Sequence, residues 1–224
     1  MNSFLDHYCE RSTPQLWDEP LNVMSNLAFF LVAFLIFKHL HATQNSKNKT
    51  RWDLWLLSGL ILAIGIGSSI WHLFALSWTL WADRIPILLF ISVFLISFLV
   101  RIFRLTLLSA FSLFSLFQII NIAIQLQYPP TTLNGSLFYL PTLVLLIVIT
   151  IILWRKNHPE IKRYFQLASI LFVTAIFFRS IDLLVCDTIP MGTHFVWHIL
   201  VASTIYPLML GLIGDSHHLT HHEK

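Results

Sequence analysis

The chain has 224 residues, of which 56% are hydrophobic and only 11% are charged, and its formal net charge is +3. This composition excludes an ordinary soluble domain, in which about a quarter of the residues are charged. The sequence also lacks a basic patch interleaved with aromatic residues, so we expect no nucleic-acid partner.

Seven stretches are long and apolar enough to cross a bilayer, which takes about 20 mostly apolar residues. They cover, in chain order, residues 21–40, 53–75, 84–101, 105–126, 136–154, 164–185 and 193–214. Because they fill almost the whole chain, we predict an all-α bundle of seven transmembrane helices that forms one domain over residues 1–224. The first 20 residues carry acids and prolines in place of a basic region followed by an apolar run, so we expect no signal peptide there.

Basic residues predict the orientation of these helices. They gather around the first, third and fifth loops, as Lys38, Lys47, Lys49, Arg51, Arg101, Arg104, Arg155, Lys156, Lys162 and Arg163. The other loops hold almost none apart from Arg84. By the positive-inside rule the N-terminal segment 1–20 is extracytoplasmic, and the histidine-rich tail 215–224 is a solvated cytoplasmic end. We expect a multi-pass integral membrane protein of a bacterial inner membrane, or of the ER or Golgi membrane in a eukaryote.

Three histidines lie in these apolar spans at one predicted depth. His72 is near the end of the second span, while His194 and His198 share one face in the first two turns of the seventh. An imidazole is costly in hydrocarbon and is usually functional there. Three neutral imidazoles leave the fourth position of a zinc ion open, so we predict a catalytic zinc site. The alternative is a set of interfacial histidines that hydrogen-bond to neighbouring helices.

Other polar residues are expected near these histidines. Ser68 shares a helical face with His72, and its hydroxyl would stabilise an oxyanion or bond to its own helix. Asp83 opens the predicted third span on the same side, where it would move a proton or cap the helix. Arg179 and Asp182 lie within one turn of each other in the sixth span, so we expect a structural ion pair.

The two cysteines, Cys9 and Cys186, both fall on the predicted outer side, where disulfides persist. Two interpretations remain open. A bridge would hold the N-terminal segment over the histidines, whereas two unrelated thiols would have no such effect.

These motifs resemble those of the alkaline ceramidase family. The family belongs to a wider group of seven-helix membrane hydrolases that includes adiponectin receptors and haemolysin-III-like proteins. The wider group has Ser-x3-His, then Asp, then His-x3-His, matched here by Ser68, His72, Asp83, His194 and His198. The ceramidase branch adds motifs matched by Cys9, Glu10, Glu19, Asn22, Ser25, Asn26, Asp182 and Cys186.

The resemblance implies a zinc-dependent membrane amidase. Its substrate would be ceramide or a related lipid amide entering from the membrane, and its products would be a free amine and a fatty acid. The family's zinc ligands are matched by His72, His194 and His198. Its catalytic pair is matched by Ser68 and Asp83, and its paired cysteines by Cys9 and Cys186.

The resemblance also implies a calcium site, which this sequence matches only in part. Glu10 and Glu19 keep two of its acidic positions. His7 and Ser12 stand where an aspartate and an asparagine are expected. Calcium prefers several oxygen ligands, and a histidine is a poor substitute, so this departure argues against calcium.

Two other classes of membrane protein remain as alternatives. The first is a receptor or signalling protein of the adiponectin-receptor type, with little or no hydrolytic turnover. The second is a transporter or light-driven pump. A retinal pump needs a Schiff-base lysine in its seventh helix, and residues 193–214 contain no lysine.

Overall fold

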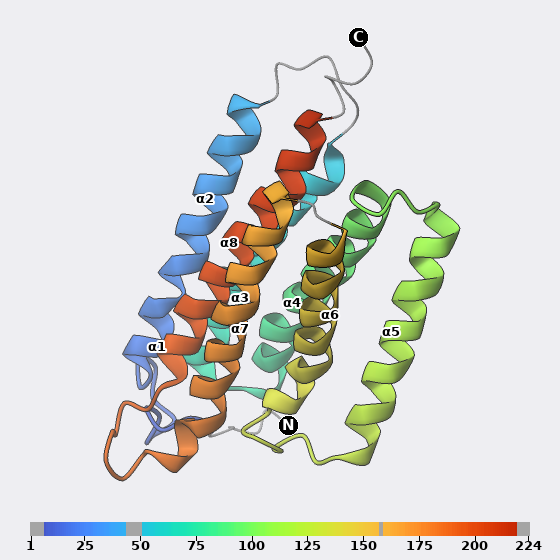
Figure 1. Ribbon diagram of the computed structural model, residues 1–224. Coiled ribbons are helices and arrows are strands. Elements are labelled where there is room, and N and C mark those ends of the chain that lie inside the picture. The colour runs from blue at the N-terminus through green and yellow to red at the C-terminus, as the bar shows by residue number, and fades with distance from the viewer. Residues whose placement is uncertain (1–6, 44–50, 157–158, 219–224) are drawn as a thin grey trace.

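The computed structural model describes residues 7–43, 51–156 and 159–218, and these residues form helices and no β-strand (Figure 1). Seven of the helical segments are long and apolar enough to cross a membrane, so the predicted all-α seven-helix bundle is confirmed. The elements are α1 Pro20–Ser25, α2 Leu27–Ala42, α3 Trp52–Phe74, α4 Ser77–Arg101, α5 Leu107–Gln127, η1 Ser136–Tyr139, α6 Leu140–Arg155, α7 Pro159–Ile181, η2 Asp182–Leu184 and α8 His194–His218. The orientation of the bundle stays a prediction, and residues 219–224 of the tail lie outside the described residues.

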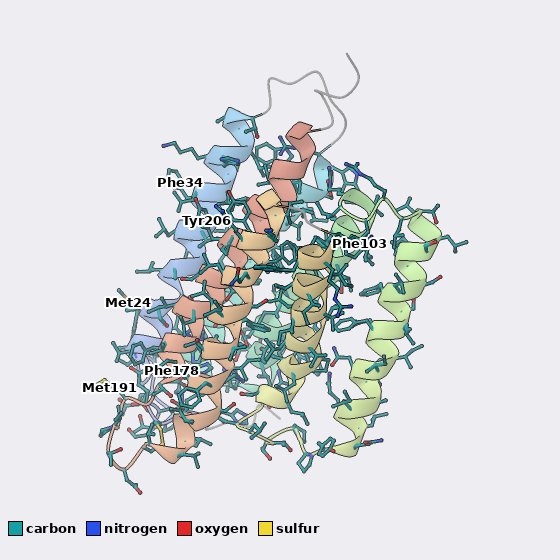
Figure 2. The ribbon with its side chains drawn as sticks, viewed as in Figure 1. Met24, Phe34, Phe103, Phe178, Met191 and Tyr206 are labelled. Carbon is teal, nitrogen blue, oxygen red and sulfur yellow. A yellow bond between two sulfur atoms is a disulfide. The ribbon has the colours of Figure 1, made fainter. Side chains whose placement is uncertain are left out.

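The burial of the spans follows their place in the bundle. α8 packs against α2 and α7 and also touches α1 and α4, and 61% of its most apolar window is buried. α5 stands at the edge in Figure 1, and only 17% of its window is buried. Phe34 on α2 is 62% exposed and points away from the bundle in Figure 2. Apolar side chains therefore cover the outside as well as the core, as lipid contact requires.

The first span is broken into α1 and α2 at Asn26. The carbonyl oxygen of Asn22 accepts hydrogen bonds from Ser25 Oγ and Asn26 Nδ2, both at 2.9 Å. Such side-chain bonds compete with the helical ladder. The break leaves α1 as a short piece at the end of the bundle where the connection from α7 to α8 also lies (Figure 1).

The third span begins earlier than predicted. α4 starts at Ser77, seven residues before the expected boundary at residue 84. Leu76 and Thr79 close its first turn, because Leu76 N donates to Thr79 Oγ1 at 3.0 Å while Thr79 N donates to Leu76 O at 2.9 Å. Asp83 is therefore inside the helix and not its N-cap, and Arg84 is not a loop residue. The prediction was wrong because their charges resemble a membrane boundary, whereas Asp83 lines an internal cavity.

Segments far apart in sequence meet around Asp182, just after α7. Cys9 and Cys186 form a disulfide across 177 residues. One carboxylate oxygen of Asp182 accepts the backbone N–H of Thr193 at 2.6 Å and of His194 at 2.9 Å, while the other accepts that of Cys9. Asp182 therefore caps the start of α8 and also holds the segment before α1.

Opening the disulfide is expected to loosen the segment before α1. A Cys186→Ser variant should lose about 2–4 kcal/mol of stability, because the link no longer restricts the unfolded chain. Limited proteolysis and thermal unfolding in detergent would measure both effects, with reductant lowering the midpoint of the wild type only. A midpoint that neither the substitution nor reductant changes would contradict the prediction.

Candidate metal centre and cavity

Three histidines from two helices converge beside the disulfide-linked end of the bundle. His72 lies in the last turn of α3, and His194 and His198 occupy the first two turns of α8. All three side chains are buried, and one ligand atom from each lies within 4.8 Å of the others. Three imidazoles this close together could hold a metal ion. Within the ranges that the structure describes, this is the only such group.

The second nitrogen of two of these rings has a partner of its own. His72 Nδ1 contacts Glu19 Oε2, and His198 Nδ1 lies 2.7 Å from Ser25 Oγ. Both contacts use Nδ1, so Nε2 of each ring remains for a metal. A carboxylate or hydroxyl on the outer nitrogen is the usual means of fixing a metal-binding imidazole. The arrangement therefore fits zinc, which takes neutral imidazole ligands.

Glu19 connects the segment before α1 to this centre. Its buried carboxylate contacts His72 Nδ1 and Arg11 Nε and accepts a hydrogen bond from Asn22 Nδ2 at 2.9 Å. Burial alone would raise the pKa of Glu19, but His72, Arg11 and Asn22 together hold that pKa below its ordinary value. Arg11 also donates to the carbonyl oxygen of His72 at 2.6 Å, so one guanidinium and one carboxylate together hold the end of α3.

Glu10 has a different role from Glu19. Its two oxygens accept the backbone N–H groups of Leu21 and Asn22, at 2.6 and 2.9 Å, at the start of α1. Burial raises the pKa of Glu10, and these hydrogen bonds offset only part of that effect. Calcium at Glu10 and Glu19 stays a prediction, and the ion would have to compete with Arg11 for Glu19.

Ser68 lies one turn before His72 and faces the metal centre. Its Oγ is 3.5 Å from His198 Nε2 and close enough to the Asp83 carboxylate to interact with it. Its neighbour Ser69 instead donates to the carbonyl oxygen of Gly65, its own helix, at 2.7 Å. The structure thus brings Ser68 and the half-buried Asp83 together with the histidines.

A glycine allows Asp83 to reach this position. A Cβ atom placed on Gly67 would lie 2.1 Å from the carbonyl oxygen of Ala82 and 3.4 Å from the Cα of Asp83. The backbones of α3 and α4 therefore touch at Gly67, next to Ser68. No other residue type allows this approach without moving one of the helices.

An apolar cavity extends from the metal centre into the bundle. It encloses about 1030 Å³ of space free of protein atoms, including the part that opens to the surroundings. Its polar end is lined by Ser68, Asp83, Arg179, His194 and His198. The remaining lining is mostly Phe, Ile, Leu and Val, with Tyr139, Thr142, Trp197 and Thr204 among them. It reaches Leu208 on α8, about 15 Å beyond His198 at the helical rise. This apolar lining suits a hydrocarbon chain.

The predicted ion pair between Arg179 and Asp182 does not form. α7 ends at Ile181, and Asp182 begins the short η2 turn, where its carboxylate caps α8. Arg179 instead faces three aromatic rings, with its guanidinium carbon 5.8, 5.4 and 5.2 Å from the ring centroids of Tyr8, Tyr139 and Trp197.

Sequence reasoning missed Tyr8, which packs against one of the three histidines. Its ring stacks on that of His194, with the ring centroids 3.8 Å apart. The adjacent Cys9 was the available signal, because a bridge from Cys9 to Cys186 brings this part of the chain near the start of α8.

Comparison with known proteins extends the argument from these residues to the chain as a whole. The family model described as Ceramidase matches residues 6–224, from the segment before α1 to the end of the chain. A search of curated proteins found no match.

Proposed function

Because the chain belongs to the ceramidase family, we propose that it is a zinc-dependent membrane amidase that cleaves the N-acyl bond of ceramide or a related lipid amide. Family membership indicates a ceramide-hydrolysing membrane enzyme, and seven apolar helices fit a multi-pass integral membrane protein. The observation that carries the zinc proposal is the buried histidine triad at the polar end of an apolar cavity. The receptor alternative is not favoured, because the matching family is that of an enzyme.

His72, His194 and His198 would hold the zinc ion. Bound there, zinc would supply Lewis acidity, which lowers the pKa of water and polarises a carbonyl group. Glu19 and Ser25 keep the His72 and His198 rings in place through their Nδ1 atoms. Their part is to fix the donor set before any substrate arrives.

Asp83 and Ser68 are the proposed reactive side chains. Water adds to the amide carbonyl carbon, and Asp83 takes the proton that this water gives up. The C–N bond then breaks, and Asp83 returns the proton to the departing nitrogen, which leaves as the free amine. Ser68 donates a hydrogen bond to the carbonyl oxygen while that oxygen carries negative charge. The other product is the fatty acid.

The lining of the cavity supports this choice of substrate. The acyl chain would lie among the apolar side chains that reach Leu208, with the amide beside Ser68 and Asp83 at the polar end. Burial of the acyl chain contributes about 0.8 kcal/mol per methylene group. The apolar lining therefore favours a long-chain lipid amide over a short, water-soluble one.

An Asp83→Asn variant is expected to lose hydrolysis by about 10²–10⁴-fold, because an amide cannot take the proton from water. It should keep its metal, since the proposed metal ligands are the three histidines and do not include Asp83. Fatty acid release from N-acylsphingosine in detergent micelles measures the rate, and Ser69→Ala is the control that should leave it unchanged. Wild-type turnover by Asp83→Asn would remove Asp83 from the mechanism, and no hydrolysis by the metal-loaded wild type would overturn the proposed function.

A further inference from the structure

Arg179 is a buried cation that makes no ion pair in the described part of the chain, although the Asp83 carboxylate at the same end of the cavity interacts with it at longer range. Arg179 is only 8% exposed, and it lies inside a membrane-spanning helix. None of the ion pairs among the described residues includes it. A buried charge is costly unless it is paired, so its presence here needs an explanation.

The hydrogen bonds of Arg179 are also incomplete. Its Nε atom is buried and has no hydrogen-bond partner. Its other two nitrogens make only long contacts, at 3.5 Å to the ring nitrogens of His194 and to the Tyr8 hydroxyl. The rings of Tyr8, Tyr139 and Trp197 stabilise the cation but bring no negative charge, and Asp83 is too far away to pair with it directly.

The unpaired guanidinium lies where a ligand can reach it. Arg179 lines the polar end of the cavity together with Ser68, Asp83, His194 and His198. It comes from α7, whereas Ser68 and Asp83 come from α3 and α4. A lipid whose amide lies near Ser68 would thus have an N–H donor at the same end of the cavity.

We propose that Arg179 binds a carboxylate group inside this cavity. The planar guanidinium donates paired N–H bonds that match the two oxygens of a carboxylate, and the anion would neutralise the buried charge. The inference rests on the proposed function, because cleavage of a lipid amide produces a fatty acid at this site. A carboxylate can also arrive on the substrate, as in an N-acyl amino acid.

Equilibrium binding of two ligands with the same chain tests the proposal. Radiolabelled hexadecanoic acid and hexadecan-1-ol are compared on the detergent-purified protein, each corrected for partition into protein-free micelles. We expect the acid to bind at least about tenfold more tightly than the alcohol, since charge-assisted hydrogen bonds contribute about 1.5–3 kcal/mol. The preference should persist after a chelator removes the metal, because it comes from the guanidinium.

Arg179→Gln is expected to lower the affinity for the acid about tenfold while leaving that for the alcohol unchanged. Arg84→Gln is the matched control, because Arg84 lies over the Phe138 ring and does not line the cavity. If Arg179→Gln lowers the affinity for the acid and for the alcohol equally, the role of Arg179 is structural and the proposal is overturned. If Arg179→Gln does not fold, the metal-free wild type decides, since equal affinities for acid and alcohol would overturn it as well.

Hydrolysis then identifies the source of the carboxylate. N-hexadecanoylglycine and N-hexadecanoylethanolamine share an acyl chain and differ in charge. A selective fall in kcat/KM for the glycine compound in Arg179→Gln assigns the carboxylate to the substrate. If Arg179→Gln leaves the ratio of the two kcat/KM values unchanged but is inhibited less by hexadecanoic acid, the carboxylate belongs to the product. Because acid binding needs no turnover, an inactive protein that still prefers the acid would refute the amidase and keep the carboxylate site.

Discussion

A His198→Ala variant is expected to lose both its metal and its hydrolytic activity. His198 is buried, its Nδ1 is held by Ser25, and its Nε2 faces Ser68, so the substitution removes a positioned ligand from the centre. Two remaining imidazoles leave zinc without the three protein ligands typical of a catalytic site. Metal analysis by mass spectrometry on detergent-purified protein, beside release of fatty acid from a lipid amide, measures both losses.

Two further variants, one with a partial expected effect and one as a control, complete this experiment. Ser25→Ala removes only the partner of His198 and should weaken metal binding about 10–100-fold without abolishing it. His41→Ala, which removes an exposed histidine on α2, should keep the wild-type metal content and rate. Zinc at wild-type stoichiometry in His198→Ala, or turnover by a metal-free sample, would count against a metal centre at these histidines.

The second large effect is expected from Gly67→Ala. Alanine normally stabilises a helix relative to glycine by about 1 kcal/mol. At Gly67, however, the new methyl group would lie 2.1 Å from the backbone of Ala82, which cannot rotate away as a side chain could. α4 must move from α3, and overpacking of this kind costs about 1–3 kcal/mol or more. Because the contact is next to Ser68 and Asp83, the hydrolysis rate should fall further than the loss of folded protein alone would explain.

α3 offers a matched control for this substitution. A Cβ atom on Gly59, two turns earlier in the same helix, would meet nothing within 4 Å. Gly59→Ala should therefore be neutral or slightly stabilising and should keep its activity. The comparison uses thermal unfolding in detergent together with the hydrolysis rate. Equal behaviour of the two variants would mean that close contact between α3 and α4 does not shape the site.

The spans could be predicted from sequence because hydropathy is a local property that bilayer thickness converts into helix length. The triad was also accessible, since one depth argument applied to His72, His194 and His198. The same reasoning failed at Asp83 and Arg84, whose charges mark an internal cavity and resemble a membrane boundary. Local hydropathy cannot distinguish these two cases.

The contacts that hold the histidine rings were beyond sequence reasoning. Glu19 is 53 residues from His72 along the chain, and Ser25 is 173 residues from His198, so neither pairing has a local signal. Arg179 and Asp182 show the opposite error. Their spacing suggested a pair, but α7 ends at Ile181 and turns the carboxylate of Asp182 toward the start of α8.

The segment before α1 has a consequence for the order in which the two reactants arrive. Tyr8 lies on His194 and Glu19 contacts His72, so this segment forms the polar wall of the metal centre. By the function proposed, a lipid amide comes from the hydrocarbon side, and we expect water to enter past the segment before α1. The two reactants would then follow separate routes, and an inhibitor that blocks the water route would leave the lipid bound and uncleaved.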